Sequence, residues 1–133
     1  MSKSVVACVE DLFFRSKIDA TARHLDIPVR FATAPGLASA CRESGTVAAL
    51  VELSDGAVEA IAAMRASGAD GALPVVGFLS HVDRELAQRA EAAGTTTVMP
   101  RSQFAETLPE LLMDLMAPGT KREMQEEPEL PDE

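Results

Sequence analysis

Short apolar runs alternate with alanine-rich segments along the first 116 residues of the chain. Five such runs, at residues 5–9, 29–32, 47–53, 74–79 and 95–99, predict five β-strands. The run at 47–53 is apolar apart from Glu52, which is typical of a strand buried on both faces. Strands of this kind, separated by helices, predict an α/β domain with a parallel sheet covered on both sides.

The segments between and after these strands predict helices, because their apolar residues recur at helical spacing. The second helix is expected from residue 35 or 36 to residue 44, with Gly45 ending it, and the third from 56 to 67. Gly94 is expected to end the fourth helix. The residues expected to face the sheet are Phe14, Ile18, Ala22 and Leu25; Val58, Ile61, Ala62 and Met64; Leu86, Ala87, Ala90 and Ala93; and Phe104, Leu108, Leu111, Leu112 and Leu115.

Two helix boundaries are predicted from particular residues. Ser80 and Asp83 have the S-x-x-D spacing of a capping box, so the fourth helix is predicted to start at Ser80. Pro109 lacks an N–H group and disfavours helix at the residue before it. The last helix is therefore predicted as one short turn before Thr107 and a main helix after it.

The composition changes from Ala117 onward to Pro, Gly and charged residues. Residues 119–133 contain six acidic and two basic side chains, a net charge of −4. Such a segment buries too little apolar surface to order itself alone. We therefore predict a domain at residues 1–116 and an acidic, disordered tail at 117–133, which is either a solvated extension or a docking segment for a basic partner.

The charge and cysteine content exclude several classes of function. Twelve Lys and Arg against 21 Asp and Glu give a net charge of −9, which argues against nucleic acid or an anionic membrane surface as a partner. Cys8 and Cys41 lie in apolar or alanine-rich runs without a CxxC motif, as expected of buried thiols in a reducing compartment. The apolar stretch near the N-terminus is too short for a signal peptide or a membrane span, so we expect a cytoplasmic protein.

Polar side chains follow four of the predicted strands at their carboxyl ends. Glu10 and Asp11 follow the first strand, Glu52 ends the third, Ser80 and His81 follow the fourth, and Arg101 follows the fifth. Because the carboxyl ends of parallel strands meet at one edge of the sheet, these residues are candidates for a common pocket.

The segments Val9-Glu10-Asp11, Pro74 to Asp83 and Gly94-x6-Arg101-Ser102 together resemble a response-regulator receiver domain over residues 4–116. The resemblance implies a flavodoxin-like, doubly wound five-stranded parallel sheet of order 2-1-3-4-5 with helices on both faces. It also implies a role for each matching position. Glu10 and Asp11 match the acid pair that binds Mg²⁺, and Glu52 falls where the phosphoacceptor Asp should be.

The same resemblance places Leu79 at the Thr/Ser switch position, with Ser80 displaced by one residue, and Arg101 at the position of the Lys. Leu79 cannot hydrogen-bond a phosphoryl oxygen. A Glu at position 52 reaches one methylene farther than Asp, which displaces both in-line attack and metal geometry. Arg101 suits a direct carboxylate pair, so we expect it to pair with Glu52 or Asp11.

These departures predict a pseudo-receiver, a non-enzymatic signalling module that acts through protein contacts without conventional Asp phosphorylation. The expected contact surface is the fourth helix, fifth strand and fifth helix, roughly residues 84–116, through which a homodimer could also form. No cofactor or metal is expected; any Mg²⁺ would use Glu10 and Asp11.

Two other interpretations stay open. In the first, the chain is a functional Mg²⁺-dependent response regulator that accepts a phosphoryl group at Glu52, Asp55 or His81. For His81, a place in the N-terminal turn of a helix is favoured over a role as proton carrier or phosphoryl acceptor. Ser54 and Asp55 are expected to cap the third helix. In the second, the chain is a small-ligand domain, although the absence of Trp and Tyr argues against flavin.

Overall fold

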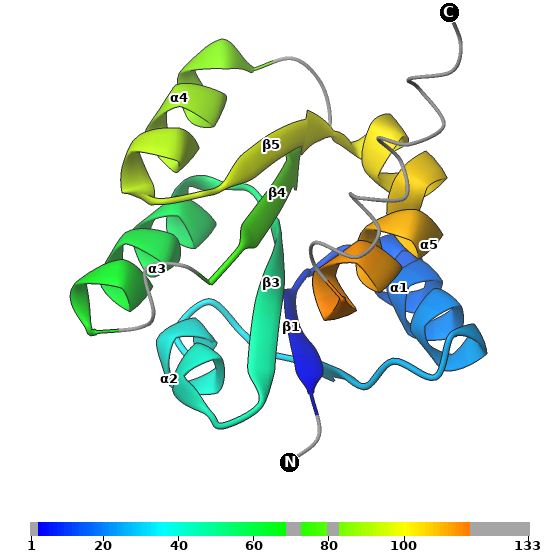
Figure 1. The fold of residues 1–133 in the computed structure, drawn as a ribbon. Helices are drawn as coiled ribbons and strands as arrows, with labels where there is room; N and C mark the ends of the chain where they lie inside the picture. Colours follow the sequence, from blue (N-terminus) through cyan, green and yellow to red (C-terminus); the bar gives the residue numbers. More distant parts are fainter. Residues whose placement is uncertain (1–2, 69–72, 80–82, 118–133) are drawn as a thin grey trace, which may run out of the picture.

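The computed structural model describes residues 3–68, 73–79 and 83–117, which form one five-stranded sheet with helices on both faces (Figure 1). All strand pairs are parallel, and the strand order is β2-β1-β3-β4-β5. This confirms the predicted flavodoxin-like fold. The strands are β1 (Ser4–Cys8), β2 (Val29–Phe31), β3 (Thr46–Glu52), β4 (Val75–Leu79) and β5 (Thr97–Pro100), and the helices are α1 (Leu12–His24), α2 (Leu37–Arg42), α3 (Asp55–Ala66), α4 (Arg84–Ala93) and α5 (Arg101–Met116).

The sheet separates two apolar layers. Helices α1 and α5 cover one face, and α2, α3 and α4 cover the other (Figure 1). Successive side chains of a strand point to opposite faces, so Val5 and Ala7 enter the first layer whereas Val6 and Cys8 enter the second. Both cysteines are buried, unpaired and in the second layer, as predicted for Cys8 and Cys41.

The helix faces agree with the predicted pattern except at a few positions. Val58, Ile61 and Met64 of α3 are buried as predicted, but Ala62 is exposed. The prediction for Ala62 is wrong because Ala57, one turn earlier than Ile61, occupies the inward stripe. Helix α2 ends at Arg42, two residues before the predicted end, where Glu43 adopts an extended backbone.

Helix α4 starts later than predicted. Asp83 itself is the N-cap, with an extended backbone and a side chain that accepts a hydrogen bond from the Leu86 N–H at 3.0 Å. The predicted start at Ser80 is therefore wrong, since a single aspartate supplies the cap; Ser80 itself lies outside the described residues. Ala90 is the buried residue of this helix, whereas Leu86, Ala87 and Ala93 are only half-buried. Helix α4 thus leaves part of its apolar face uncovered.

Helix α5 is continuous, which corrects the predicted division at Pro109. The proline lies on the exposed side of the helix, where its ring faces solvent. Phe104 and Leu108 before it and Leu112 and Leu115 after it are all buried against the sheet. Burial of this one stripe outweighs the single backbone hydrogen bond that the proline removes.

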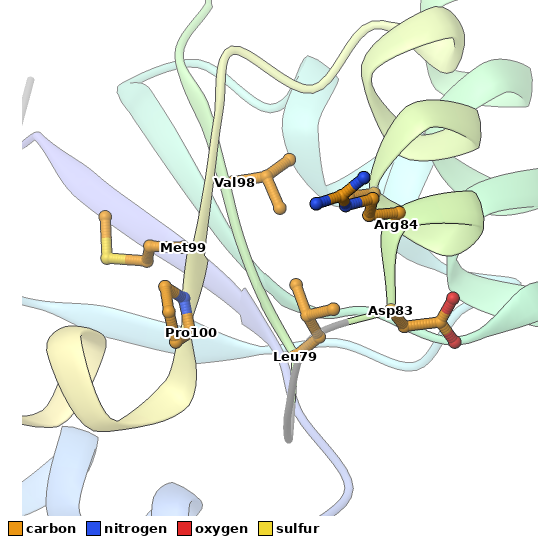
Figure 2. A pocket seen from close by; sticks show the side chains of 7 residues that line it. Leu79, Asp83, Arg84, Val98, Met99 and Pro100 are labelled. Carbon is orange, nitrogen blue, oxygen red and sulfur yellow. The ribbon is translucent and has the colours of Figure 1, made fainter.

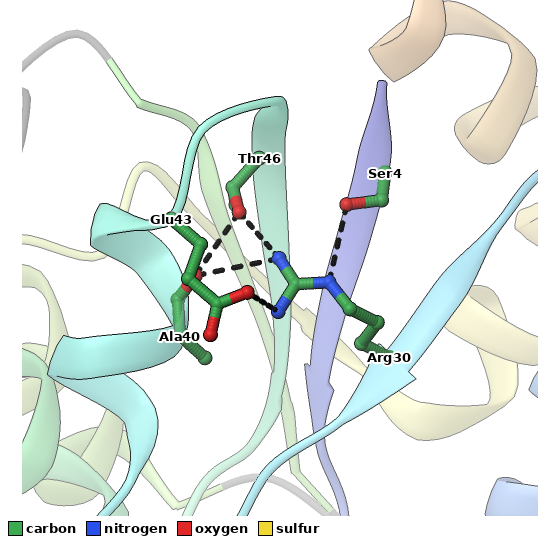
Figure 3. A network of polar contacts seen from close by, with 5 residues as sticks. All are labelled: Ser4, Arg30, Ala40, Glu43 and Thr46. Atoms are coloured by element: carbon green, nitrogen blue, oxygen red, sulfur yellow. Dashed lines mark hydrogen bonds and ion pairs between the residues drawn. The ribbon is translucent and has the colours of Figure 1, made fainter. Parts of the chain in front are cut away.

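The amino end of the sheet is held together by Arg30, which extends from the edge strand β2 (Figure 3). Its guanidinium donates to Thr46 Oγ1 at 2.6 Å and to Ser4 Oγ at 3.3 Å, and it forms an ion pair with Glu43 at 2.8 Å. This network links β2, β1, β3 and the end of α2 at the side of the sheet opposite the predicted pocket. In the described part of the chain, no helix is both long enough and apolar enough to cross a bilayer.

Candidate functional site at the carboxyl end of the sheet

Glu52 is the last residue of the central strand β3, and its carboxylate reaches across to the loop after β1. Oε1 of Glu52 accepts hydrogen bonds from the backbone N–H of Glu10 at 2.8 Å and of Asp11 at 3.1 Å. The extra methylene of a glutamate allows this reach. The carboxylate thus binds the backbone of the acid pair, which places Glu52 beside the loop that carries Glu10 and Asp11.

The side chain of Asp11 has a structural partner of its own. Asp11 is the N-cap of α1, and its Oδ1 accepts from the backbone N–H groups of Phe13 at 2.9 Å and Phe14 at 3.2 Å. This cap satisfies two amides that have no partner within the helix. One oxygen of Asp11 is therefore committed to α1.

A small cavity of about 140 Å³ lies between Glu10, Glu52 and the start of α3. Ser54, the N-cap of α3, lines it and accepts from the Ala57 N–H at 3.1 Å, as predicted for this residue. Cys8 also lines the cavity, and burial, followed by the charges of Glu10 and Glu52, raises the pKa of its thiol. Cys8 is therefore a neutral, unreactive thiol at neutral pH.

The loop between β3 and α3 is short. Only Leu53 and Ser54 separate Glu52 from Asp55, the first residue of α3. Asp55 pairs with Arg89 of α4 at 2.7 Å, so its carboxylate is directed to the neighbouring helix.

The carboxylates do not gather as the ligands of a divalent cation would. A Mg²⁺ ion needs several oxygens arranged around one point. Within residues 3–68, 73–79 and 83–117, no group of three or more His, Cys, Asp or Glu side chains could hold a metal ion. One oxygen each of Glu52 and Asp11 is bound to backbone amides instead. The donor set therefore does not fit the Mg²⁺ site that the resemblance implies.

The expected pairing of Arg101 with Glu52 or Asp11 is wrong. Arg101 is the exposed first residue of α5, and its guanidinium has neither a hydrogen bond nor an ion pair to any described residue. The carboxylate oxygens that were expected to meet it accept from backbone N–H groups. Ser80 and His81 lie outside the described residues, so the structure places neither of them.

Leu79 lies at the end of β4 and is buried, and it lines an apolar pocket of about 160 Å³ (Figure 2). The other lining residues are Asp83, the N-cap of α4, Arg84 and Ala87 of α4, and Val98, Met99 and Pro100 of β5. Figure 2 shows the Arg84 side chain extending toward Val98 at the edge of the pocket, whereas the carboxylate of Asp83 points away. This pocket was not predicted from the sequence. The one available signal was the alanine-rich face of α4, because alanine side chains are too small to fill the space beside β5.

Comparison with known proteins agrees with this architecture. No family profile matches the sequence, and no curated protein is similar enough to count as a match. Solved structures do match. The chain superposes on chemotaxis protein CheY4 of Vibrio cholerae with a TM-score of 0.72 at 17% identity, covering 86% of this chain and 99% of that one.

Two further structures extend the comparison. A response regulator from Hahella chejuensis has a TM-score of 0.74 at 18% identity and covers 88% of this chain and 97% of that one. The phosphorylated cyanobacterial phytochrome response regulator RcpA has a TM-score of 0.72 at 12% identity, covering 90% and 98%.

The chain has the receiver fold. The matches span nearly the whole length of each of these receiver proteins, so no large element of the fold is missing. At identities below 20%, however, the likeness concerns the backbone, and the side chains at the carboxyl end of the sheet have to be judged from their own contacts. In this receiver fold those contacts join Glu52 to the amides of Glu10 and Asp11.

Proposed function

We propose that this chain is a receiver-like signalling module that acts through protein contacts and does not depend on phosphorylation at the end of β3. The observation that carries the proposal is the pair of hydrogen bonds from the Glu10 and Asp11 amides to Glu52 Oε1. A phosphoacceptor carboxylate must present an oxygen to the incoming phosphorus atom. Here Oε1 of that carboxylate is held by two backbone amides of the loop after β1, which fixes the orientation of the whole carboxylate.

Three other features support the proposal. Leu79 offers no hydrogen bond at the switch position, because its side chain is aliphatic and buried. Arg101 has no partner in the described chain through which the basic position could be linked to Glu52 or Asp11. The described carboxylates do not form a Mg²⁺ site. The residues that would accept, sense and neutralise a phosphoryl group are therefore each replaced or engaged elsewhere.

The contact surface that we propose is the face formed by α4, β5 and the N-terminal part of α5. Helix α4 leaves Leu86 and Ala87 half-buried, and the pocket beside Val98 is lined almost wholly by apolar atoms. Partly open apolar surface of this kind is typical of protein interaction sites. We propose another signalling protein as the partner, and a second copy of this chain as the other outcome that partner mapping would reveal.

Incubation with acetyl phosphate and Mg²⁺, followed by intact-protein mass spectrometry, tests the phosphorylation claim. We expect the full chain to keep its mass under conditions in which a receiver protein with an Asp at this position gains one phosphoryl group. A stoichiometric, acid-labile phosphoryl group that disappears in Glu52→Gln would overturn the proposal and support the Mg²⁺-dependent alternative. A label that persists in Glu52→Gln would point to another acceptor and would overturn it equally.

Titration with beryllofluoride gives a second, independent measurement. This anion mimics a phosphoryl group bound to a carboxylate and needs the same metal and oxygen geometry. We expect no saturable change in the amide NMR signals of Glu10, Asp11 and Leu53. Saturable, Mg²⁺-dependent shifts at these three amides would show an intact phosphoryl site.

A further inference from the structure

The apolar pocket beside β5 is lined by Arg84, and Arg101 directly follows its lining residue Pro100; neither arginine side chain has a partner in the described chain. Of the eight arginines in residues 3–68, 73–79 and 83–117, six have a hydrogen bond or an ion pair, including Arg30 with Glu43 and Arg89 with Asp55. The other two are Arg84, which lines the pocket, and Arg101, which follows the pocket residue Pro100. Asp83 also lines the pocket, but its carboxylate points away from it, whereas the Arg84 guanidinium extends toward Val98 (Figure 2). In a chain with a net charge of −9, a guanidinium without a partner in the described chain at this pocket, with a second one on the residue after Pro100, favours binding of anionic groups.

The sequence contains one segment with the matching chemistry. Residues 123–133 read Glu-Met-Gln-Glu-Glu-Pro-Glu-Leu-Pro-Asp-Glu, with six carboxylates and no basic residue. Leu130 lies between Glu129 and Asp132, so an apolar side chain is flanked by negative charge on both sides. The neighbouring Pro128 and Pro131 limit the backbone conformations of this segment, which reduces the entropy lost when it binds.

The length of the chain allows this segment to reach the pocket. Helix α5 begins directly after Pro100 and has 16 residues, so its far end lies about 24 Å from the pocket at 1.5 Å per residue. The 14 residues from Ala117 to Leu130 are joined by 13 Cα–Cα steps and span up to about 43 Å when extended. The segment can therefore return along α5 with chain to spare.

We infer that the acidic C-terminal segment of this chain docks on its own α4-β5 pocket, with Leu130 against Leu79 and Val98 and the flanking carboxylates beside Arg84 and Arg101. The inference rests on the proposed function, because it adds regulation to the same contact surface. A tail bound there competes with any partner for the pocket. Partner binding then requires release of the tail, which high salt or a basic protein would favour.

Methyl NMR of the full chain tests this inference. Leu130→Ser removes the apolar anchor, and Met124→Ser is the matched control because it removes a similar side chain from the same tail. We expect the methyl signals of Leu79, Ala87 and Val98 to shift in Leu130→Ser and to stay in place in Met124→Ser. Unchanged pocket signals in Leu130→Ser would overturn the inference.

A peptide of residues 119–133 added to the Leu130→Ser chain tests the same contact in the reverse direction. We expect it to restore the wild-type methyl positions and to bind about tenfold more weakly when Arg84 and Arg101 are both replaced by Glu. Arg89→Glu is the control on the same helix, since Arg89 faces Asp55. Equal affinity for the double variant and for the Arg89→Glu control would show that the two arginines do not recognise the segment and would overturn the inference.

Dilution separates docking within one chain from docking between two copies. We expect the wild-type pocket signals to be independent of protein concentration. A return to the Leu130→Ser positions on dilution would assign the occupant to a second copy and would overturn docking within one chain. A phosphoryl group gained from acetyl phosphate would overturn the proposed function alone and would leave these methyl results as they are.

Discussion

Glu52 connects the carboxyl end of the central strand β3 to the loop after β1. A carboxylate next to a buried strand is costly unless it is hydrogen-bonded or hydrated. Glu52 meets this requirement with two backbone amides, which also fixes the loop between β1 and α1. The residue therefore has a structural role at the end of β3, the position at which the sequence resemblance predicted a phosphoacceptor.

Replacing Glu52 by Ala should destabilise the fold by about 2 kcal/mol, because hydrogen bonds to a charged acceptor contribute roughly 1.5–3 kcal/mol. Glu52→Gln keeps an acceptor oxygen and should cost less. The measurements are urea unfolding and hydrogen exchange at the Glu10 and Asp11 amides, which should quicken in Glu52→Ala. Glu59→Ala, at an exposed position on α3, is the control. Equal stability of Glu52→Ala and Glu59→Ala would contradict this role.

The position of Glu52 was predictable from the sequence, but its partners were not. A single polar residue at the end of an apolar run marks a strand end, and strand ends converge in a parallel sheet. The choice between the Arg101 guanidinium and the backbone amides depends on where the loop after β1 lies and where α5 begins. Neither can be read from residue spacing, and the predicted ion pair was wrong for this reason.

Between elements, Arg65 of α3 connects the end of α4 to the sheet. It donates to the carbonyl oxygen of Gly94 from Nη2 at 2.8 Å and from Nε at 3.2 Å, and to the Leu73 carbonyl at 2.9 Å. Gly94 has a φ of +118°, and a Cβ placed there would lie 2.7 Å from Arg65 Cγ. Glycine is therefore required at this position both by the positive φ of the backbone and by the closeness of the Arg65 side chain.

Gly94→Ala should therefore lower the free energy of unfolding by about 2–3 kcal/mol, through left-handed backbone strain and displacement of Arg65. Gly68→Ala is a matched control, since its φ is +94° and nothing lies within 4 Å of the added Cβ. That variant should lose only the backbone part, about 1 kcal/mol. Chemical denaturation of both variants measures the difference, and equal losses would show that the contact with Arg65 has no cost.

Pro109 illustrates why helix boundaries are hard to predict from local sequence. The proline disfavours helix at Leu108, yet Leu108 is fully buried in the middle of α5. Tertiary burial outweighs the local preference, and only the completed sheet provides that burial. The same applies to Ser80 and Asp83, where spacing indicated a cap but not which residue supplies it.

Pro109→Ala should stabilise the protein by about 1–3 kcal/mol, because alanine restores one hydrogen bond in the helix and removes the clash of the ring with the preceding turn. Glu110→Ala, at the next exposed position, is the control for helix propensity alone. Thermal unfolding of the two variants provides the comparison. A Pro109→Ala midpoint at or below that of wild type would show that α5 bends around the proline without cost.

For the whole molecule, the alternation of strands and helices and the two apolar layers followed from the sequence because the apolar runs and helical stripes were mutually consistent. The strand order was predicted only through the resemblance to receiver domains. The features that the sequence did not show depend on shape: the pocket between α4 and β5, and Arg84 beside it, whose side chain has no partner among the described residues. Half-buried alanines on α4 leave a space that larger residues would fill. A pocket is space left between packed elements, and the pattern of residues along the chain does not show which spaces stay unfilled.

The second apolar layer predicts how stability depends on alkaline pH. Burial raises the pKa of Cys8, with added repulsion from Glu10 and Glu52; burial also raises the pKa of Cys41, against the opposing charges of Arg65 and Arg30. Below the ordinary value of 9.0, the thiols are neutral in both the folded and the unfolded chain. Above it, the unfolded chain releases these protons while the folded chain retains them, so stability falls as pH rises.

We therefore expect the free energy of unfolding to decrease above pH 9.0 by up to about 1.4 kcal/mol per pH unit for each thiol. The double variant Cys8→Ala/Cys41→Ala lacks this contribution. Its stability is lower at neutral pH because small cavities remain, but it should decline less steeply with pH. Urea unfolding of both proteins between pH 7 and 10.5 measures the two slopes. Parallel curves would mean that the thiols titrate alike in the folded and unfolded chains, which their burial in the second apolar layer argues against.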